Sequence, residues 1–398
     1  MKKVYLFSAI AVMAAVTACT KEPVNNQPDP EEGPVPVQFG LASPEYSVTT
    51  KSAGGLDEWD NTTLYVYGFV RTETDYNNAF INNVAATAES GKRTSLDVND
   101  AANSGNPYYY QGDAVYDFYG YHIDDAAEGG TPEPIVVDEA GAAQDDGTSL
   151  THGVYIPFTI NGSQDLMTAT ADPTADVGET GVDPTRAYSA YAARRAVHPT
   201  LTFQHQLARF KFQIKAGARS GMDVQVNAIE ILNQKATGYL KVVGADQGIT
   251  VAADDPGNTT FTLKEQGLDG MQDLTSKAPT TDFVEGKTQA ADPIGESIMI
   301  FPGGESCKIN IKTTNIDASI DTPTPIPDQE FTINASDLLK NGTEESAGAT
   351  EFEAGKKYTI TIIIYGPEDI EITAALTDWE DGGEVTWDPD DPQTGTGE

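Results

Sequence analysis

Apolar and polar residues alternate in short segments along most of this chain. The first such segment, residues 35–41, reads Val-Pro-Val-Gln-Phe-Gly-Leu, and its period of two predicts a strand with one buried face. Pro36 cannot donate a backbone hydrogen bond, which favours a position at a sheet edge. Segments rich in β-branched and aromatic residues predict further strands at 62–70, 115–121, 201–215 (two strands or one bent strand), 224–232, 238–243, 259–263, 297–301, 309–312, 330–333, 357–365 and 370–376.

Helical periodicity is nearly absent between these segments. Two long connections, residues 124–152 and 171–188, are rich in Asp, Gly and Ala, and this composition predicts surface loops or disordered insertions rather than core. Short strands that are separated by turn residues, without helices between them, are typical of β-sandwiches and barrels. The pattern therefore predicts an all-β protein.

The length of the chain predicts more than one core. A single hydrophobic core rarely serves a chain of 398 residues. We expect two β domains, residues 35–196 and 197–388, that meet near Arg195–Pro199. The last residues, 389–398, are rich in Asp, Pro and Gly and predict an acidic, proline-rich tail.

The amino terminus has the features of an export signal. Two lysines precede an apolar run from Val4 to Val16, and this run is shorter than the roughly 20 apolar residues that a membrane span requires. The sequence Val-Thr-Ala-Cys that ends at Cys19 resembles a bacterial lipobox, so residues 1–18 are predicted to be a lipoprotein signal peptide. The resemblance implies that lipid on Cys19 anchors the protein to the outer membrane. The alternative is an ordinary signal peptide with an accidental cysteine.

Charge and composition restrict the partners of the exported protein. Residues 19–34 are rich in Pro, Asn and acidic residues, which predicts a flexible tether between the lipid and the fold. The formal net charge is −37, so the body of the protein would repel both nucleic acid and an anionic membrane surface. If Cys19 carries lipid, Cys307 has no partner for a disulfide, and its place before an alternating segment predicts a small packed residue at the start of a strand.

No catalytic signature is present in the sequence. It contains no zincin helix, P-loop, nucleophile elbow or glycine-rich dinucleotide turn, so we predict neither enzyme activity nor a cofactor. The acidic segments 97–100 and 388–391 lack the glycine and glutamate of an EF-hand, so we interpret them as solvated charge and predict no metal site. The histidines are scattered, and each is predicted to be structural: His122, His152, His198 and His205.

Tyrosine is concentrated in one part of the chain, where Tyr108–Tyr110 are followed by Tyr116, Tyr119 and Tyr121. Exposed rings would suit stacking on glycans or contact with proteins, whereas buried rings would pack in the core of a sandwich. We favour the core, because aromatic residues in β proteins are mostly buried.

Several short motifs occur together over nearly the whole chain after residue 18. Besides the lipobox at Cys19, they are Gln-Asp-Leu-Met at 164–167, Phe-Gln-His-Gln-Leu-Ala-Arg at 203–209, Asn-Ala-Ile-Glu-Ile at 227–231, Gly-Lys-Lys-Tyr at 355–358 and Leu-Thr-Asp-Trp at 376–379. In these motifs and their order the chain resembles the fimbrillin family of Bacteroidales, whose members are pilins and accessory subunits. The resemblance implies two transthyretin-like β-sandwich domains in tandem, and a structural, tip or accessory subunit of cell-surface fimbriae.

The same resemblance implies how such a subunit assembles. Members are exported as lipoproteins, a trypsin-like or arginine-specific protease cuts after the first strand, and a strand of a neighbouring subunit fills the groove that opens. In this chain the released strand would be 35–41, and the cut would fall between Lys51 and Ser52 in a small, Gly-rich segment. Lysine disfavours an arginine-specific protease, and the alternative is that Lys51 is an ordinary loop residue. Arg71 directly follows a predicted strand and is expected to be less accessible.

The carboxyl end leaves the type of subunit open. After Trp387 the chain is dominated by Asp, Pro and Gly, which make a poor donor strand, although Val385 and Trp387 could form a short plug. We expect a fimbrial subunit of the outer membrane and the fimbrium that serves adhesion. Its expected partners are other subunits, the membrane through lipid on Cys19, and a host or bacterial surface ligand. The alternative is a permanently lipidated surface protein that binds a glycan or host ligand and does not polymerise.

Overall fold

Strands make up most of the computed structural model. It describes residues 33–42, 62–88, 107–124, 133–267, 270–280, 283–287, 289–319, 322–340, 347–378 and 384–385. The helices within these ranges are short: α1 (Pro173–Val177), η2 (Pro184–Arg186), α2 (Ala190–Ala193), η3 (Arg219–Asp223) and η4 (Ala335–Asp337). The predicted all-β class is confirmed.

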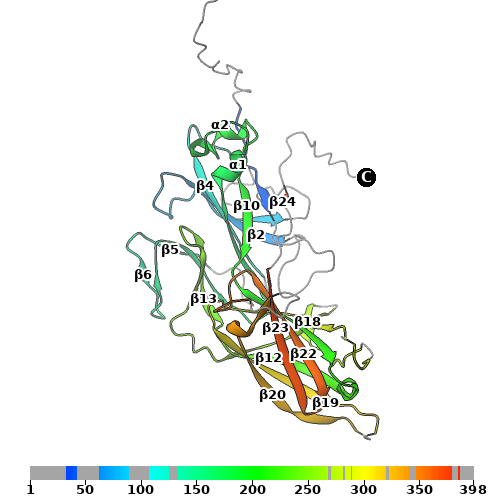
Figure 1. Cartoon of the computed structure of the whole chain (residues 1–398). Helices are drawn as coiled ribbons and strands as arrows, with labels where there is room; N and C mark the ends of the chain where they lie inside the picture. The colour runs from blue at the N-terminus through cyan, green and yellow to red at the C-terminus, as the bar shows by residue number, and fades with distance from the viewer. Residues whose placement is uncertain are drawn as a thin grey trace, which may run out of the picture. The chain divides into compact units, whose positions relative to one another are not determined.

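The largest sheet has seven strands and contains both the first and the last strand of the described residues. Its strands, in spatial order, are β24 (Glu384–Val385), β1 (Gly40–Ala42), β10 (Thr200–His205), β9 (Leu166–Ala171), β4 (Tyr116–Ile123), β2 (Thr62–Val70) and β3 (Ile81–Ala88) (Figure 1). β1 pairs in parallel with β10, whereas all other neighbours in this sheet are antiparallel. The sheet therefore brings together strands from both ends of the chain.

The first strand is shorter than the sequence predicted. Only β1 joins the ladder with β10, whereas residues 35–37 pair with residues 108–110 through two backbone hydrogen bonds of 2.8 and 3.0 Å. The prediction of a single strand over residues 35–41 was therefore wrong in its extent. β1 also lies between β10 and β24 rather than at the edge. Alternation predicts which side chains are buried, but it does not say which neighbours the backbone pairs with.

Short helices cover one face of the seven-stranded sheet. Four side chains of residues 172–188, between β9 and β10, are buried in the core of this sheet: Val177, Val182, Ala187 and Tyr188. The prediction that residues 171–188 form surface loops or insertions was wrong. Asp172 and Asp183 accept hydrogen bonds from the first turns of α1 and η2, each of which starts with proline. A segment whose composition is typical of loops therefore contains the starts of two helices.

A four-stranded sheet combines strands from both sides of the expected domain boundary. Its spatial order is β14 (Gly248–Val251), β13 (Thr237–Val243), β8 (Gly153–Thr159) and β5 (Ile135–Val137). Between β5 and β8, β6 (Ala142–Ala143) and β7 (Ser149–Leu150) form a small hairpin. Residues 124–152 were predicted to form loops or insertions. For the part of this range that forms β5, β6 and β7, the prediction was wrong. The division at residues 196 and 197 stays a prediction.

Two further sheets, shown in Figure 1, supply many of the side chains of the larger apolar core. The first has the spatial order β18 (Asp292–Ile300), β11 (Ala208–Ala216), β22 (Lys356–Gly366), β23 (Asp369–Asp378) and β21 (Leu339–Lys340). The second has the order β15 (Thr259–Thr262), β12 (Val224–Gln234), β19 (Ser306–Asn315) and β20 (Thr324–Asn334). β16 (Lys264–Gly267) and β17 (Gly270–Asp273) form a separate hairpin. The predicted segment 201–215 is thus two strands, β10 and β11, in different sheets.

Alternating burial explains why these two sheets pack together. Every second residue of β22 from Tyr358 to Ile364 is fully buried, and so are Ile309 and Ile311 on β19. All of them belong to one apolar cluster. Burial of one large apolar side chain contributes about 1.5–3 kcal/mol, so two such faces stabilise each other strongly. That the chain contains two transthyretin-like sandwiches in tandem stays a prediction.

Candidate functional site

The segment 35–42 inserts side chains into the core of the seven-stranded sheet. Val37 and Phe39 are only 6% and 1% exposed, and the ring of Phe39 meets Phe118 of β4 edge-on, with centroids 5.1 Å apart. Burial of each side chain contributes about 1.5–3 kcal/mol. The segment is thus part of the fold, while residues 43–61, which connect it to β2, lie outside the described ranges.

Backbone pairing holds β1 on both sides. β1 lies opposite residues 200–202 in the parallel ladder, and the Gly40 N–H donates to the Pro199 carbonyl at 2.9 Å. The approach is close, because a Cβ on Gly40 would lie 3.0 Å from the Thr200 hydroxyl. β24 pairs antiparallel with β1. β1 is therefore an inner strand that separates β10 from β24.

The tyrosine cluster is divided between two cores, since Tyr110 and Tyr116 belong to the core that holds Phe39 and Tyr121 belongs to the larger one. Tyr110, Tyr116 and Tyr121 are at most 6% exposed, whereas Tyr109 is 40% exposed. Burial raises the pKa of Tyr110 and of Tyr121 well above the ordinary value of tyrosine. The expectation that these rings pack in the core is confirmed for the three buried tyrosines.

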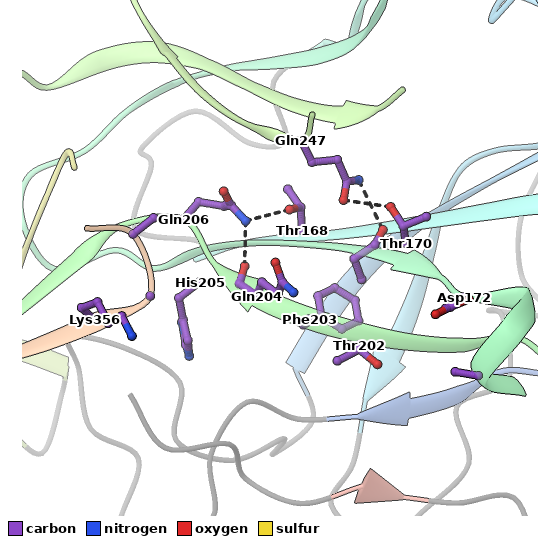
Figure 2. Close-up of a pocket in the computed structure, with 14 residues that line it drawn as sticks. Thr168, Thr170, Asp172, Thr202, Phe203, Gln204, His205, Gln206, Gln247 and Lys356 are labelled. Atoms are coloured by element: carbon purple, nitrogen blue, oxygen red, sulfur yellow. Dashed lines mark hydrogen bonds between the residues drawn. The ribbon is translucent and has the colours of Figure 1, made fainter. Parts of the chain in front are cut away.

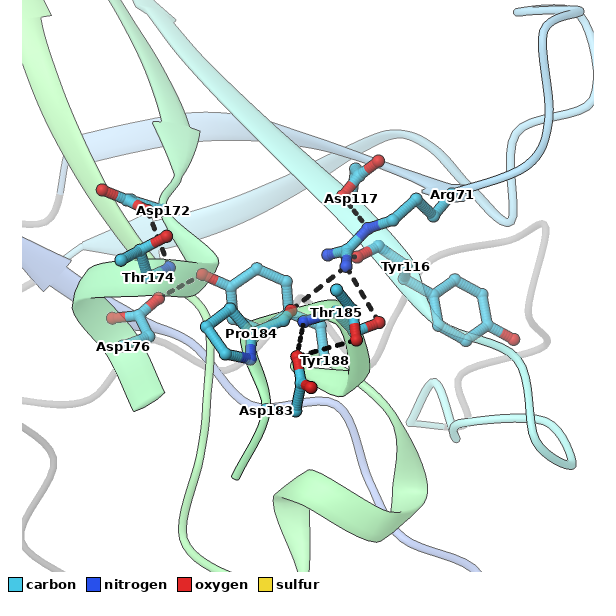
Figure 3. Close-up of polar contacts among 10 residues, drawn as sticks. All are labelled: Arg71, Tyr116, Asp117, Asp172, Thr174, Asp176, Asp183, Pro184, Thr185 and Tyr188. Atoms are coloured by element: carbon cyan, nitrogen blue, oxygen red, sulfur yellow. Dashed lines mark hydrogen bonds and ion pairs between the residues drawn. The ribbon is translucent and has the colours of Figure 1, made fainter. Parts of the chain in front are cut away.

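Arg71 joins the end of β2 to the helical cover (Figure 3). Its Nε donates to Asp117 Oδ1 at 2.7 Å, and Nη2 donates to the Tyr116 carbonyl at 3.2 Å. Its Nη1 donates to the carbonyls of Pro184 and Thr185, both at 3.2 Å. One side chain thereby connects β2, β4 and η2. These bonds agree with the expectation that Arg71 is a poor protease site, since cleavage requires a segment that can leave the fold.

A half-buried carboxylate, Asp176, connects α1 to β10, and Figure 3 shows its contact with Tyr188. The Tyr188 hydroxyl donates to Asp176 Oδ2, and the same oxygen accepts the Thr200 N–H at 2.8 Å. Burial raises the pKa of Asp176 above its usual range, although these hydrogen bonds oppose the shift. Because Thr200 starts the strand that pairs with β1, the helical cover fixes the position of that partner strand.

Sequence reasoning missed these contacts because both Asp176 and Tyr188 lie in the connection that was interpreted as a loop. The sequence of this connection did contain a signal for the two helices. Asp172-Pro173 and Asp183-Pro184 each place a capping carboxylate directly before a proline, which is typical of a helix start. Contact between the two helices and β10 still depends on the tertiary fold.

Two histidines pair with carboxylates inside the fold. His205 Nδ1 lies 2.7 Å from Asp165 Oδ2, and both side chains are almost fully buried, which confirms the interpretation of His205 as a packed residue. His122 Nδ1 lies 2.7 Å from the Thr63 carbonyl and its Nε2 lies 3.1 Å from Asp124 Oδ1. Burial lowers the pKa of His122, but its contacts with Asp124 outweigh this, so the pKa is raised.

Several predicted features fall outside the described ranges: Cys19, Lys51, Ser52 and the acidic segments 97–100 and 388–391. Within those ranges, no group of three or more His, Cys, Asp or Glu side chains could hold a metal ion. None of the described helices is long and apolar enough to cross a membrane.

Cys307 is a packed residue of β19. Its side chain is 3% exposed, and burial raises the pKa of its thiol to about 12. A reactive thiol requires access and a lowered pKa, and Cys307 has neither. The interpretation of Cys307 as a small residue at a strand start is confirmed.

Comparisons with known proteins give a consistent result. The family model described as fimbrillin-like matches residues 49–379. A solved protein assigned to cell adhesion, from Bacteroides uniformis, is 18% identical with a TM-score of 0.42, over 86% of this chain and 99% of that one. A second, from Bacteroides ovatus, is 16% identical with a TM-score of 0.44, over 87% and 98%. The tip fimbrial protein Mfa3 of Porphyromonas gingivalis, truncated at its C terminus, is 11% identical with a TM-score of 0.34, over 86% and 99%.

Comparison with curated protein sequences found none that matches the chain. The family match begins after β1 and ends within the segment that follows β23, so it covers most of the fold described above. This family consists of fimbrial proteins and not of enzymes, in agreement with the sequence analysis. The chain belongs to the fimbrillin-like family.

Proposed function

We propose that this protein is a fimbrial subunit that is exported as a lipoprotein on Cys19, cut between Lys51 and Ser52, and assembled by strand exchange. The insertion of residues 35–42 into the core is the observation that carries this proposal. The segment supplies two buried side chains and one strand of the sheet, yet only residues 43–61 connect it to β2. A cut in that connection would leave the segment held by noncovalent contacts alone.

Departure of the segment would open an acceptor groove. Phe118 would lose the ring of Phe39, and one edge of β10 would lose its backbone partner. An apolar groove beside an unpaired strand favours the addition of a strand from another molecule. An incoming strand in the register of β1 would run parallel to β10 and place apolar side chains where Val37 and Phe39 stood. The start of the family match at residue 49, after this segment, supports a separable role for it.

In this proposal the cut at maturation separates the subunit from its lipid. The acylated fragment stays in the outer membrane, while the rest of the chain joins its neighbours in a fimbrium at the cell surface. The interaction partners are therefore other fimbrial subunits first, and a host or bacterial surface ligand second. Repeated subunits in one fimbrium would serve adhesion by presenting many copies of a ligand site.

The test is the state of the amino terminus on the cell. The protein is purified from the cell surface, its terminal residue is determined by mass spectrometry, and an unheated sample is run on a detergent gel. A start at Ser52 together with a ladder of oligomers is expected. A lipidated Cys19 and a single monomer band would overturn the proposal.

A pair of variants makes this test specific. Lys51→Ala removes the proposed cleavage position and should abolish both the new terminus and the ladder. Lys287→Ala removes another lysine, which lies exposed between β17 and β18, and should change neither. A ladder that persists in Lys51→Ala would place the cut elsewhere or show that no cut is needed.

The second candidate function is a permanently lipidated surface protein that binds a ligand without polymerising. One observation favours it, since β24 pairs with β1 of its own chain. Residues 388–391, Asp-Pro-Asp-Asp, are also poorly suited to a donor strand. The same mass spectrum separates the candidates, because this protein would keep its acylated Cys19.

A further inference from the structure

A cavity of about 750 Å³ lies over the outer face of β9 and β10 (Figure 2). This volume is within the range of sites that take small molecules, about 300–1,000 Å³. Its lining includes Thr168 and Thr170 of β9 and Thr202 and Gln204 of β10. They form two cross-strand pairs, because Thr170 lies opposite Thr202 and Thr168 lies opposite Gln204. Their neighbours along both strands are buried in the core, so the cavity is lined by the polar face of the sheet.

Two glutamines from outside these strands also line the cavity, and both are held in place by hydrogen bonds (Figure 2). The Gln247 amide nitrogen donates to the Val242 carbonyl at 2.6 Å, and its Oε1 accepts from the Thr170 hydroxyl at 2.9 Å. The Gln206 amide nitrogen donates to the Thr168 hydroxyl at 2.8 Å. Gln206 is 9% exposed. These side chains are thus positioned before any ligand arrives, which reduces the entropy lost on binding.

The lining is nearly neutral in a chain of net charge −37. Besides His205, its titratable side chains are Asp172 and Lys356, which Figure 2 shows toward opposite ends of the cavity. The remaining polar groups are hydroxyls and carboxamides, and each of these can both donate and accept hydrogen bonds. Sugar hydroxyls have the same dual capacity, whereas an anion would meet Asp172 and the negative field of the whole protein.

A peptide fits this surface less well. Peptide strands bind by extending a sheet at an unpaired edge. β10 is paired with β1 and β9, and β9 is paired with β10 and β4, so neither strand offers its backbone. We propose that the cavity binds a neutral oligosaccharide through hydrogen bonds to the exposed side chains of Thr170, Thr202 and Gln204. Binding at this cavity is a further activity, beyond the proposed assembly function.

The expected affinity of a single site is low. Among the lining residues the one aromatic carbocycle is that of Phe203, which is 1% exposed and belongs to the core, so it offers no face for stacking on a sugar. Hydrogen bonds alone suggest a dissociation constant on the order of 1 mM. Many copies on one surface would raise the avidity by roughly 10²–10⁴-fold.

Saturation-transfer NMR tests the proposal on the full chain, purified in a detergent without a sugar headgroup. The neutral probes are lactose, maltotriose, cellotriose, mannotriose and chitotriose, and sialyllactose and a Ser-Gly tetrapeptide represent the competing classes. The double variant Thr202→Ala/Gln204→Ala removes two exposed side chains of the lining. The matched control is Thr260→Ala/Gln272→Ala, which truncates an exposed Thr on β15 and an exposed Gln on β17.

The expected result is saturable transfer to at least one neutral probe. This signal should weaken by about ten- to a hundredfold in affinity in the lining variant, because each lost hydrogen bond lowers affinity by up to roughly tenfold. It should persist in the control variant. No signal from any neutral probe at about 10 mM, a signal from sialyllactose or the peptide alone, or binding that survives the lining variant would overturn the proposal.

Discussion

Replacement of Phe39 by alanine tests how the first segment is held. Phe39 is 1% exposed and meets Phe118 edge-on at 5.1 Å, so the change removes a fully packed side chain. Truncation of a buried phenylalanine costs about 3–5 kcal/mol. Since about 1.4 kcal/mol corresponds to a factor of ten, the affinity of the nicked protein for its own first segment should fall by about 10²–10⁴-fold.

The assay must separate release of the segment from a general loss of stability. The chain is nicked after Lys51, and release of the amino-terminal fragment is followed over time by size exclusion and mass spectrometry. Phe261→Ala is the matched control, because Phe261 is equally buried but lies on β15 in the other core cluster. Both variants should lose a similar free energy of unfolding, yet only Phe39→Ala should release the fragment faster. Equal release from both would refute the reasoning that the Phe39 ring holds this segment.

Three further predictions concern other buried contacts. Because the pKa of His122 is raised, its stabilising contribution is complete below the ordinary pKa of 6.5 and is lost as pH rises through the raised value. In urea unfolding, the free energy by which wild type is more stable than His122→Gln should therefore be larger at about pH 6 than at about pH 9. Arg71→Lys should destabilise the fold by about 1–3 kcal/mol and speed trypsin cleavage at Arg186, because lysine cannot bond Asp117 and the backbone of η2 together. Cys307, with its raised thiol pKa of about 12, should react with maleimide only after unfolding.

Each of these predictions has a clear contrary result. An advantage of wild-type His122 that grows with pH would contradict the sign of its pKa shift. Unchanged stability and protection in Arg71→Lys would show that the bonds to η2 contribute little. Rapid labelling of Cys307 in the native protein would mean that β19 opens readily, and mass spectrometry of the labelled chain would show it.

The sequence predicted many of the longer strands because their side-chain pattern is local, but it did not predict β3, β8 or β9. The segment 62–70 coincides with β2, and 357–365 differs from β22 by one residue at each end. Both carry β-branched or aromatic residues at every second position, and burial alternates along most of β22 and over residues 62–66 of β2, whereas residues 66–69 are all buried. His205 and Cys307 were interpreted correctly for a similar reason, since each lies within or beside an alternating apolar run.

The connection 171–188 shows where local reasoning failed. Its Asp, Pro and Gly content matches that of a loop, yet Val177 and Tyr188 are buried against the sheet. Composition gives the average environment of a segment, whereas burial depends on which surface lies opposite. The approach of Arg71 to η2, across more than a hundred residues of sequence, could not be read from either segment alone.

By itself the sequence determined the all-β class, the position of most strands, the family resemblance and the absence of catalytic motifs. These features depend on residue type and on spacing within a few positions. Both can be read directly from the sequence. Only the tertiary structure decided that residues 35–37 and β1 pair with different neighbours, that β1 lies between β10 and β24, and that Gln206 and Gln247 meet the polar face of β9 and β10. Such contacts join segments far apart in the chain, so their geometry arises only when the sheets pack.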